Sequence, residues 1–472
     1  MNPLDPLDAA MMTAELVSNP MHVGAVLILS PPRGAGAGYV NRLHRESLAG
    51  TVAIDPRLRR YPYRGLDTGG LWVWREADAV DMSRHCRRRT VSHGDFWGLI
   101  GELDAERLDR SGPMWMSYLI DGLDGDRPGG RFALYVKVHH TVVDGVAGFQ
   151  MIADALSDDP KRRSMPPFYA ERRHEPTPPP ASTGPEYGPL SGLVPPLRSL
   201  VGAAVSGIGL VGRVVTGELS TVVDTLIGHT TVLPFGAPRT RFNGRLGPER
   251  AVAAGSWAKN RFTAVQHAAG VTGAEVLTAT VAGVLRRCLQ DLGELPGRSL
   301  VAACPITVRG HGRDAADDRH GNQFGLWLCP LGTDLDDPLA RLQVVHRSMS
   351  EGKRWVAKRG SAASLLTNAG SIAATLIVPL LPFGGTVRTG YNLPISHVPG
   401  PPTNMYWNGA HVDEIYPVST VYDGQALNVT TCSYADRIGF GYAAGAHTVP
   451  DITRLIPLTE QCLAELEAAV GL

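Results

Sequence analysis

The segment Val138-His139-His140-Thr141-Val142-Val143-Asp144-Gly145 joins a strand-like stretch to a helix-like one. Before it, apolar residues alternate as in a strand with one buried face: Phe132, Leu134, Val136 and Val138. After it, apolar residues recur at the spacing of a helix: Val146, Phe149, Ile152 and Leu156. The sequence therefore predicts a strand, a short turn and a helix, with His140 at the entrance of the turn.

The two adjacent histidines favour a catalytic base at this turn. By the alternation of a strand, His140 continues the apolar face and His139 points to the opposite face. Histidine, with an unperturbed pKa of about 6.5, is the usual general base near neutral pH. The alternative is a pair of core histidines bonded to backbone, but the strand-end position and the following Asp-Gly favour catalysis. A metal site is not favoured, because no His-x-x-x-His or Cys-x-x-Cys accompanies the pair.

The spacing His-His-x-x-x-Asp-Gly resembles the signature of the chloramphenicol-acetyltransferase-like acyltransferases. These include acetyltransferases, condensation domains of peptide synthetases, polyketide-associated acyltransferases and the bacterial wax ester synthase/diacylglycerol acyltransferases. Other segments are similar, in chain order, to motifs of the last of these families. They are residues 3–9, 19–24, 108–115, 304–309, 321–323, 395–401, 416–418, 423–424, 427–429 and 433–434. The resemblance covers nearly the whole chain apart from its middle.

This resemblance implies an α/β fold of two chloramphenicol-acetyltransferase-like domains, each a mixed sheet flanked by helices, with the active-site channel at their interface. It also implies transfer of a long-chain acyl group from acyl-coenzyme A to the hydroxyl of diacylglycerol, giving triacylglycerol, or of a long-chain alcohol, giving a wax ester. His140 is then the general base, and no covalent acyl-enzyme forms, in agreement with the lack of a Gly-x-Ser-x-Gly sequence. No metal or tightly bound cofactor is implied, since the coenzyme A thioester is a substrate.

The same resemblance suggests roles for the residues around His140. His139 supports the geometry, and Asp144 and Gly145 shape the turn. A buried carboxylate needs a cationic partner, and Arg309, which ends a predicted strand, is the expected partner of Asp144. Polar residues of the second domain are candidates for binding the substrate or the tetrahedral oxyanion: Asn322, Gln323, Ser396 and His397.

The chain departs from the family pattern at two places. The Asn-Asp pair of the family is Ala274-Glu275 here, and the Asn of its Ser-Asn-Val-Pro-Gly-Pro motif is His397. The resemblance places both positions around the active-site cleft, so the acceptor is left open. One alternative is an acyltransferase for another hydroxyl, such as that of a glycolipid or a polyketide. The other is a catalytically weak, lipid-binding homologue.

Length and composition bound the organisation of the chain. Its 472 residues exceed one ordinary domain, and a Pro-rich stretch interrupts them. We expect an N-terminal acyltransferase domain at 1–160, a Pro-rich linker with an apolar helical connection at 161–235, and a C-terminal acyltransferase-like domain at 236–472. A formal net charge of zero gives no general case for nucleic-acid binding. Six scattered cysteines and the lack of an N-terminal signal sequence favour the cytoplasm. The oligomeric state is not indicated.

Two further segments bear on lipid and donor binding. Residues 360–387 carry no charge and are long enough to span a bilayer, but prolines, polar residues and a Gly pair interrupt them. We expect a broken apolar helix that lines an acyl tunnel or lies on the membrane, the alternatives being a true span or an ordinary core helix. This fits peripheral contact with the inner face of the membrane or with lipid bodies. The cluster Arg84, Arg87, Arg88 and Arg89 is a weak candidate for the coenzyme A phosphates, and a solvated strand edge is favoured over it.

Overall fold

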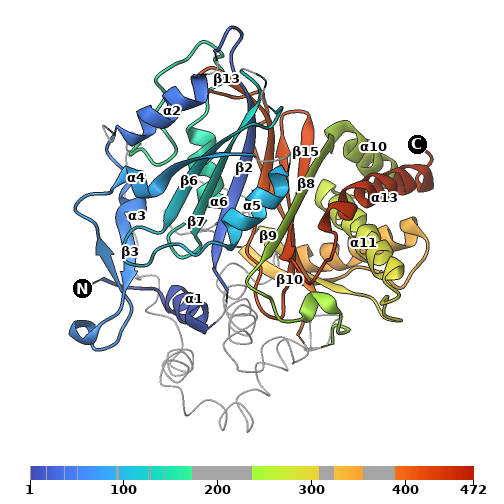
Figure 1. Ribbon diagram of the computed structural model, residues 1–472. Helices are drawn as coiled ribbons and strands as arrows, with labels where there is room; N and C mark the ends of the chain where they lie inside the picture. The colour runs from blue at the N-terminus through green and yellow to red at the C-terminus, as the bar shows by residue number, and fades with distance from the viewer. Residues whose placement is uncertain are drawn as a thin grey trace, which may run out of the picture.

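The computed structural model describes residues 2–17, 19–36, 38–49, 52–91, 95–125, 127, 129–143, 145–172, 236–307, 324–354 and 389–472. These residues form two large mixed sheets with helices, one in each half of the molecule (Figure 1). A three-stranded sheet of β1 (Asn2–Pro3), β4 (Val73–Glu76) and β3 (Arg60–Tyr63) flanks the first half. The expected α/β fold of two domains is therefore confirmed.

The first large sheet has the order β12-β13-β2-β7-β6-β5. Its strands are β12 (Tyr406–Trp407), β13 (Ala410–Val418), β2 (His22–Ser30), β7 (Phe132–His139), β6 (Trp115–Asp121) and β5 (Cys86–Thr90). Only the edge pair β5–β6 is parallel among these neighbours. The helices of this half are α1 (Pro6–Val17), α2 (Tyr39–Leu48), α3 (Pro56–Arg59), α4 (Met82–His85), α5 (Phe96–Ala105) and α6 (Gly145–Asp154).

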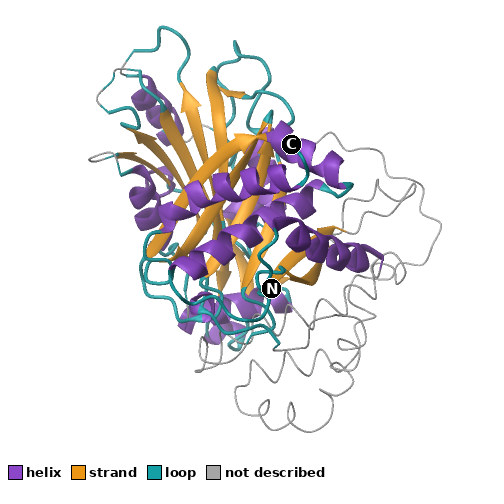
Figure 2. Ribbon diagram, turned by 90° about the vertical axis from the view of Figure 1, so that its right-hand side faces the viewer, coloured by secondary structure: helices purple, strands orange, loops and turns teal. Residues whose placement is uncertain are grey.

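The second large sheet has the order β10-β9-β11-β14-β15-β8. Its strands are β10 (Phe324–Pro330), β9 (Val301–Thr307), β11 (Leu393–Pro399), β14 (Leu427–Tyr434), β15 (Arg437–Gly445) and β8 (Arg250–Ala258). Its outer face is covered by α10 (Lys259–Ala269), α11 (Gly273–Asp291), α13 (Leu455–Ala469) and the helical residues 338–354 (Figure 2). Short 3₁₀ turns complete the fold at Leu66–Thr68, Arg241–Asn243 and Ile452–Arg454.

Strand β13 ties the two halves together. It follows β11 of the second sheet along the chain, but it hydrogen-bonds to β2 of the first sheet. There it crosses β15, where two glycines face it. A Cβ on Gly441 would overlap the carbonyl oxygen of Pro417 and lie 3.0 Å from its carbonyl carbon, and a Cβ on Gly439 would lie 3.2 Å from the Tyr416 ring. The alternating glycines of β15 therefore let the two sheets approach at the backbone, while Phe440 packs into the core on the other side.

Most elements that the sequence pattern predicts are present. The pattern of the sequence predicts a strand at 23–29, a helix at 271–290 and a hairpin at 426–444, and the structure has β2, α11 and β14–β15 there. The pattern also predicts a helix at 39–53, but α2 is shorter and ends at Leu48. Of the expected linker, residues 161–172 lie against the first half and contribute Met165, Phe168 and Tyr169 to its core.

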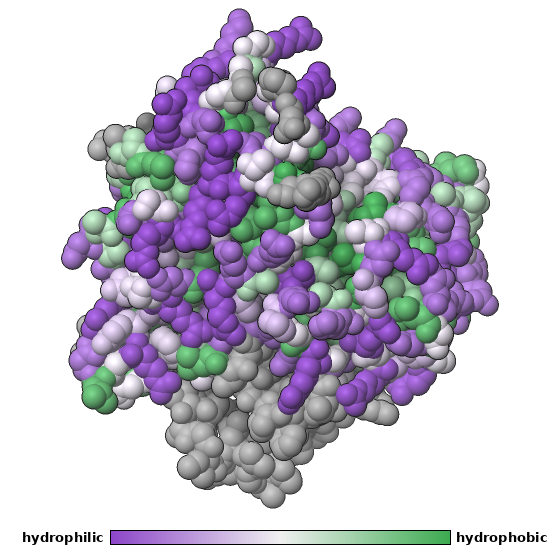
Figure 3. Space-filling view, in the orientation of Figure 1, coloured by the Kyte–Doolittle hydropathy of each residue, from purple (hydrophilic) through white to green (hydrophobic). Residues whose placement is uncertain are grey.

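The seam between the halves has its own apolar core. Helix α5 packs against β8, and a Cβ on Gly101 of α5 would lie 2.6 Å from the carbonyl oxygen of Arg250. Ile100 and Leu103 of α5 share this core with Val252 of β8. Figure 3 shows hydrophobic residues at the surface near the middle of this face, over α5.

The length and hydropathy of the helices bear on whether they could cross a membrane. Within the residues that the structure describes, no single helix is both long and apolar enough to cross a bilayer. Helices α10 and α11, bent by 103° at their junction, meet the length and composition test only as a pair. The uncharged segment at 360–387 lies outside the described residues.

Candidate active site

The histidine pair lies at the point where β7 turns into α6. Strand β7 ends at His139, and His140 is the first residue of the turn. His139 is fully buried, whereas His140 is only half-buried. The alternation of β7 is confirmed, because Phe132, Leu134, Val136 and Val138 pack into one core and Ala133 and Tyr135 into another. The expectation of a single buried face is wrong, because all of β7 is buried. His140 lies after the end of the strand, so the side on which it was expected stays a prediction.

Backbone hydrogen bonds hold both histidines to neighbouring strands. The His139 N–H donates to the carbonyl of Met114 at 2.9 Å, and the His140 N–H donates to the carbonyl of Met21 at 2.9 Å. Met114 directly precedes β6 and Met21 directly precedes β2. The start of the turn is thus fixed from the strands on both sides of β7.

His139 organises the rest of the turn through its ring and its carbonyl. The backbone N–H of Thr141 donates to His139 Nδ1 at 3.2 Å, and the N–H groups of Val142 and Val143 donate to the His139 carbonyl at 2.9 and 3.3 Å. Because Nδ1 accepts, a neutral His139 ring carries its proton on Nε2. Nε2 lies 3.3 Å from Oε2 of Glu15, close enough for an electrostatic contact. His139 therefore holds the turn on one side of its ring and contacts Glu15 on the other.

Helix α6 follows the turn and fixes its far end. Gly145 is the first residue of α6. The expected apolar positions Phe149, Ile152 and Leu156 are buried in the core of the first half. Four of the expected site residues lie outside the described residues: Asp144, Arg309, Asn322 and Gln323. The predicted Asp144–Arg309 pair thus stays a prediction.

The second half reaches this site through the end of β11. A Cβ on Gly400, directly after β11, would lie 3.4 Å from the ring of Phe149 in α6. Val398 of β11 packs against the same core as Phe149. Strand β11, which contains the candidate residues Ser396 and His397, therefore ends beside α6, the helix that follows the His140 turn.

A chain of hydrogen bonds links Ser396 to the strand beside the histidines. Ser396 Oγ lies 2.8 Å from Thr430 Oγ1, which donates to Asn428 Oδ1 at 2.9 Å. Asn428 Nδ2 donates to the carbonyl of Thr420 at 3.1 Å, and Thr420 Oγ1 donates to the carbonyl of His22 at 2.9 Å. His22 is the β2 partner of His139. Since Thr430 uses its own proton toward Asn428, Ser396 is the donor to Thr430.

His397 is an exposed residue of β11. Its Nδ1 is 2.9 Å from Thr431 Oγ1 on β14. Desolvation by the surrounding protein, together with the charge of Lys259, lowers its pKa to about 4. At neutral pH His397 is therefore uncharged.

The Ala274-Glu275 pair has a local structural role. The carboxylate of Glu275 accepts from the Thr272 backbone N–H at 2.9 Å and caps the start of α11. It also contacts His346 Nδ1 at 2.8 Å and Lys353 Nζ at 2.9 Å. Burial alone would raise the pKa of Glu275, but these three partners lower it. Glu275, the residue that departs from the family pattern, therefore has two charged or polar side-chain partners, His346 and Lys353.

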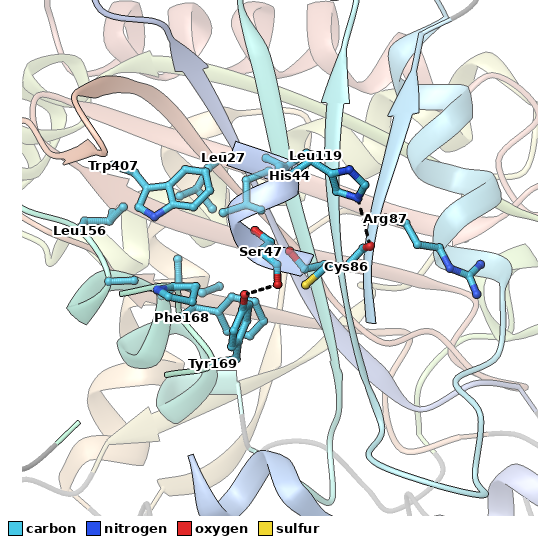
Figure 4. A pocket seen from close by; sticks show the side chains of 15 residues that line it. Leu27, His44, Ser47, Cys86, Arg87, Leu119, Leu156, Phe168, Tyr169 and Trp407 are labelled. Atoms are coloured by element: carbon cyan, nitrogen blue, oxygen red, sulfur yellow. Dashed lines mark hydrogen bonds between the residues drawn. The ribbon is translucent and has the colours of Figure 1, made fainter. Parts of the chain in front are cut away.

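A pocket lies in the first half between the sheet and its helices (Figure 4). Its apolar wall includes Leu134 of β7 and Leu156 beyond α6, the two elements joined by the His140 turn. On its polar side, His44 Nε2 lies 3.2 Å from the Cys86 carbonyl. Arg87 of the expected basic cluster lines the same pocket.

The remaining members of the basic cluster are partly paired with acids. Arg84 is ion-paired with Asp109, and Arg88 with Asp121, on the exposed edge strand β5 and the helix before it. Such surface pairs are typical of a solvated strand edge. Within the described ranges, no group of three or more His, Cys, Asp or Glu side chains is arranged to hold a metal ion.

Sequence reasoning missed Glu15, the carboxylate beside His139. It lies in α1, far from the histidines along the chain, and nothing in the local pattern of α1 distinguishes it from a surface acid. Glu15 lies six residues before Met21, between the two N-terminal segments 3–9 and 19–24 that resemble the family, and this proximity is the one sequence signal that points to it. Only the fold brings these residues together.

Known proteins resemble this chain in sequence and in fold. Residues 4–277 match the family described as wax ester synthase/diacylglycerol acyltransferase catalytic domain, and residues 320–467 match the WS/DGAT C-terminal domain. A Mycobacterium tuberculosis protein, Rv3740c, provisionally named a diacylglycerol O-acyltransferase, is 34% identical over 476 residues, which span 99% of this chain and 100% of that protein. A wax ester synthase/diacylglycerol acyltransferase from Marinobacter aquaeolei VT8 has a solved structure with 30% identity and a TM-score of 0.76, covering 100% of both chains.

More distant structures share the fold alone. The starter condensation domain of rhizomide synthetase, solved in complex with C8-CoA and Leu-SNAC, has a TM-score of 0.52 at 12% identity. It covers 100% of this chain and 94% of its own. The two-domain arrangement expected from the histidine motif is thus the arrangement of these structures.

Proposed function

Since this chain belongs to the wax ester synthase/diacylglycerol acyltransferase family, we propose that it transfers a long-chain acyl group from acyl-coenzyme A to diacylglycerol, to a long-chain alcohol, or to both. The observation that carries this proposal is the position of His140. It is a half-buried histidine in a turn whose neighbouring amides are all held by His139 and by adjacent strands. A base fixed in this way can meet a substrate without losing its orientation.

The proposed reaction is a single displacement at the thioester carbonyl. A ring nitrogen of His140 takes the proton of the acceptor hydroxyl as that oxygen bonds to the carbonyl carbon. The tetrahedral oxyanion then collapses, the carbon–sulfur bond breaks, and His140 returns the proton to the thiolate of coenzyme A. Such a general base contributes roughly 10²–10⁴ in rate.

Donors to the oxyanion come from the second half in this proposal. His397, uncharged at neutral pH and exposed on β11, is one candidate. Ser396 gives its proton to Thr430 in this conformation, so it would need to rotate to donate to an oxyanion. Asn322 and Gln323 stay candidates from the sequence alone.

The acceptor and the cellular setting are the finer parts of the proposal. The name of the M. tuberculosis relative supports diacylglycerol, and the name of the M. aquaeolei structure supports both acceptors. Peripheral contact of a cytoplasmic enzyme with a lipid surface is consistent with such water-insoluble acceptors. The assignment of domains to 1–160 and 236–472 stays part of the same proposal.

The test is thiol release from palmitoyl-coenzyme A with diacylglycerol, hexadecanol or no acceptor. The wild-type chain is compared with His140→Ala and with His411→Ala, a partly exposed histidine whose Nδ1 contacts Asp413. We expect acceptor-dependent release that His140→Ala lowers by at least about 100-fold and that His411→Ala retains. Equal release by His140→Ala and wild type would falsify the mechanism. A folded wild type inactive with both acceptors would favour another hydroxyl or a lipid-binding role.

A further inference from the structure

We propose that Glu15 is a positioning residue for His140: one buried carboxylate in α1 holds the residues on both sides of the base in place. This inference rests on the proposed role of His140, and it adds a residue that the motif itself does not contain. Glu15 touches neither the reacting atoms nor His140, so its action passes through Met21 and His139.

The carboxylate of Glu15 contacts both supports of the turn. Oε1 accepts from the backbone N–H of Met21 at 3.2 Å, and Oε2 lies 3.3 Å from Nε2 of His139. Met21 in turn accepts the N–H of His140. His139 accepts the next three amides of the turn. Glu15 therefore contacts Met21 and His139, the two residues that accept the backbone N–H groups of residues 140–143.

The carboxylate is itself held in place by neighbouring groups. Glu15 is buried, with 1% of its surface exposed. Arg110 donates to Oε2 at 2.9 Å, and Arg107 donates to the backbone carbonyl of Glu15 at 2.9 Å. Burial alone would raise the pKa of Glu15, but His139, Arg110 and the Met21 N–H outweigh it and lower the pKa to about 2. The group is ionised at every pH at which the protein would be assayed.

The charge of Glu15 also selects the form of His139. With Nδ1 accepting from Thr141, the ring must carry its proton on Nε2, and the ionised Oε2 favours a proton there. The opposite tautomer would place a lone pair against the carboxylate and an N–H against the Thr141 N–H. Glu15 thereby fixes the ring orientation on which the turn depends.

An amide cannot replace this carboxylate. In Glu15→Gln, the single side-chain oxygen can accept either from the Met21 N–H or from Arg110 and His139. The NH₂ group cannot accept, so it faces the remaining donor. The substitution changes few atoms, yet it leaves at least one buried donor without an acceptor. Glu15→Asp keeps the charge but withdraws it by one methylene, so it should restore part of the function.

Asp104 provides a matched control. It is a buried carboxylate whose Oδ1 lies 3.1 Å from His22 Nε2 and accepts from the Tyr135 hydroxyl at 2.9 Å. Asp104→Asn thus removes the same charge from beside a buried histidine on the neighbouring strand. Its side-chain contacts are with His22 and Tyr135, and they do not include Met21 or His139.

The experiment measures acyl transfer and backbone protection on the same full-length variants. We expect Glu15→Gln to lower kcat of acceptor-dependent thiol release by about 100-fold, with KM for palmitoyl-coenzyme A changed less than about threefold, because only positioning is lost. Glu15→Asp should recover at least part of kcat, and Asp104→Asn should stay within about threefold of wild type. In hydrogen exchange, the amides of residues 140–143 should exchange at least about tenfold faster in Glu15→Gln than in wild type or Asp104→Asn.

The two readouts separate this proposal from the proposed function. If the wild type transfers no acyl group but Glu15→Gln still loosens residues 140–143, acyl transfer fails and the positioning role stands. If Glu15→Gln is folded and exchanges like wild type at these residues, the positioning role is wrong, whatever the activity. Equal loss of kcat in Glu15→Gln and Asp104→Asn would also overturn it, since a general loss of stability would then explain both.

Discussion

Adding one methyl group at Gly441 should separate the two sheets where they cross. In Gly441→Ala the new Cβ would overlap the carbonyl oxygen of Pro417 and lie 3.0 Å from its carbonyl carbon. Carbon atoms in optimal contact are about 3.5–4.0 Å apart, and the overlap with the oxygen is tighter still, so β13 and β15 must move apart by at least about 1 Å. Both colliding groups are backbone, and neither can rotate away as a side chain would.

The expected loss follows from this forced separation. Overpacking of a close-packed core costs about 1–3 kcal/mol, and the rigid backbone favours the upper end of this range. The lower entropy of the unfolded chain with alanine returns about 0.4–1 kcal/mol. The net loss is about 2 kcal/mol, which corresponds to a Tm lower by about 4–8 °C at the sensitivity of a domain of 150–250 residues.

Gly441→Ala should also lower acyl-transfer activity. Gly441 pairs with Thr430 on β14, and Thr430 belongs to the chain of hydrogen bonds that runs from Ser396 to His22. A wider gap beside Thr430 should weaken this chain and lower kcat of acceptor-dependent thiol release. Assays well below Tm separate this effect from unfolding.

Gly297→Ala is the control for the chemical change alone. An ideal Cβ on Gly297 has nothing within 4 Å, and the residue is exposed. Thermal melting of the three proteins by circular dichroism gives the comparison. A Gly441→Ala protein that melts within about 1 °C of Gly297→Ala would refute the argument, because a contact this close must then be relieved without cost.

Two other side chains give predictions of a different kind. Burial lowers the pKa of Lys137 from 10.5 to about 8, so the unfolded chain binds more protons between these values and the free energy of unfolding should rise with pH across them, by about 3 kcal/mol. Lys137→Met should abolish this rise in urea titrations at pH 8 and 10, and an equal rise in both proteins would contradict the assignment. If His397 contacts the acceptor, as proposed, His397→Asn shortens that contact and should raise kcat/KM for diacylglycerol relative to hexadecanol by about threefold. An unchanged ratio would show that His397 does not contact the acceptor.

The local parts of the site were accessible from the sequence. Alternation before His139 and helical spacing after Gly145 are set by neighbours in the chain, so the strand, turn and helix could be predicted. The same rule failed to assign the buried face, because alternation reports burial only when one face of a strand meets water. Strand β7 lies inside the first sheet with cores on both sides, and its entire length is buried.

The long-range parts could not be predicted in this way. Glu15 approaches His139 only because α1 folds back against the turn, and no periodicity within α1 encodes that contact. The placement of β12 and β13 in the first sheet is equally non-local, since β11 before them and β14 after them belong to the second sheet. The glycines of β15 that permit the crossing are visible in the sequence, but their reason is the backbone of another strand.

The start of β2 is where the two halves of the protein meet the proposed base. The carbonyl of Met21 accepts the N–H of His140, and the carbonyl of the next residue, His22, accepts the hydroxyl of Thr420. Glu15 acts on Met21 from the first half, and the chain from Ser396 reaches His22 from the second. Two consecutive peptide groups therefore carry the constraints from both halves. The proposed base is thus linked to the second half through the start of β2.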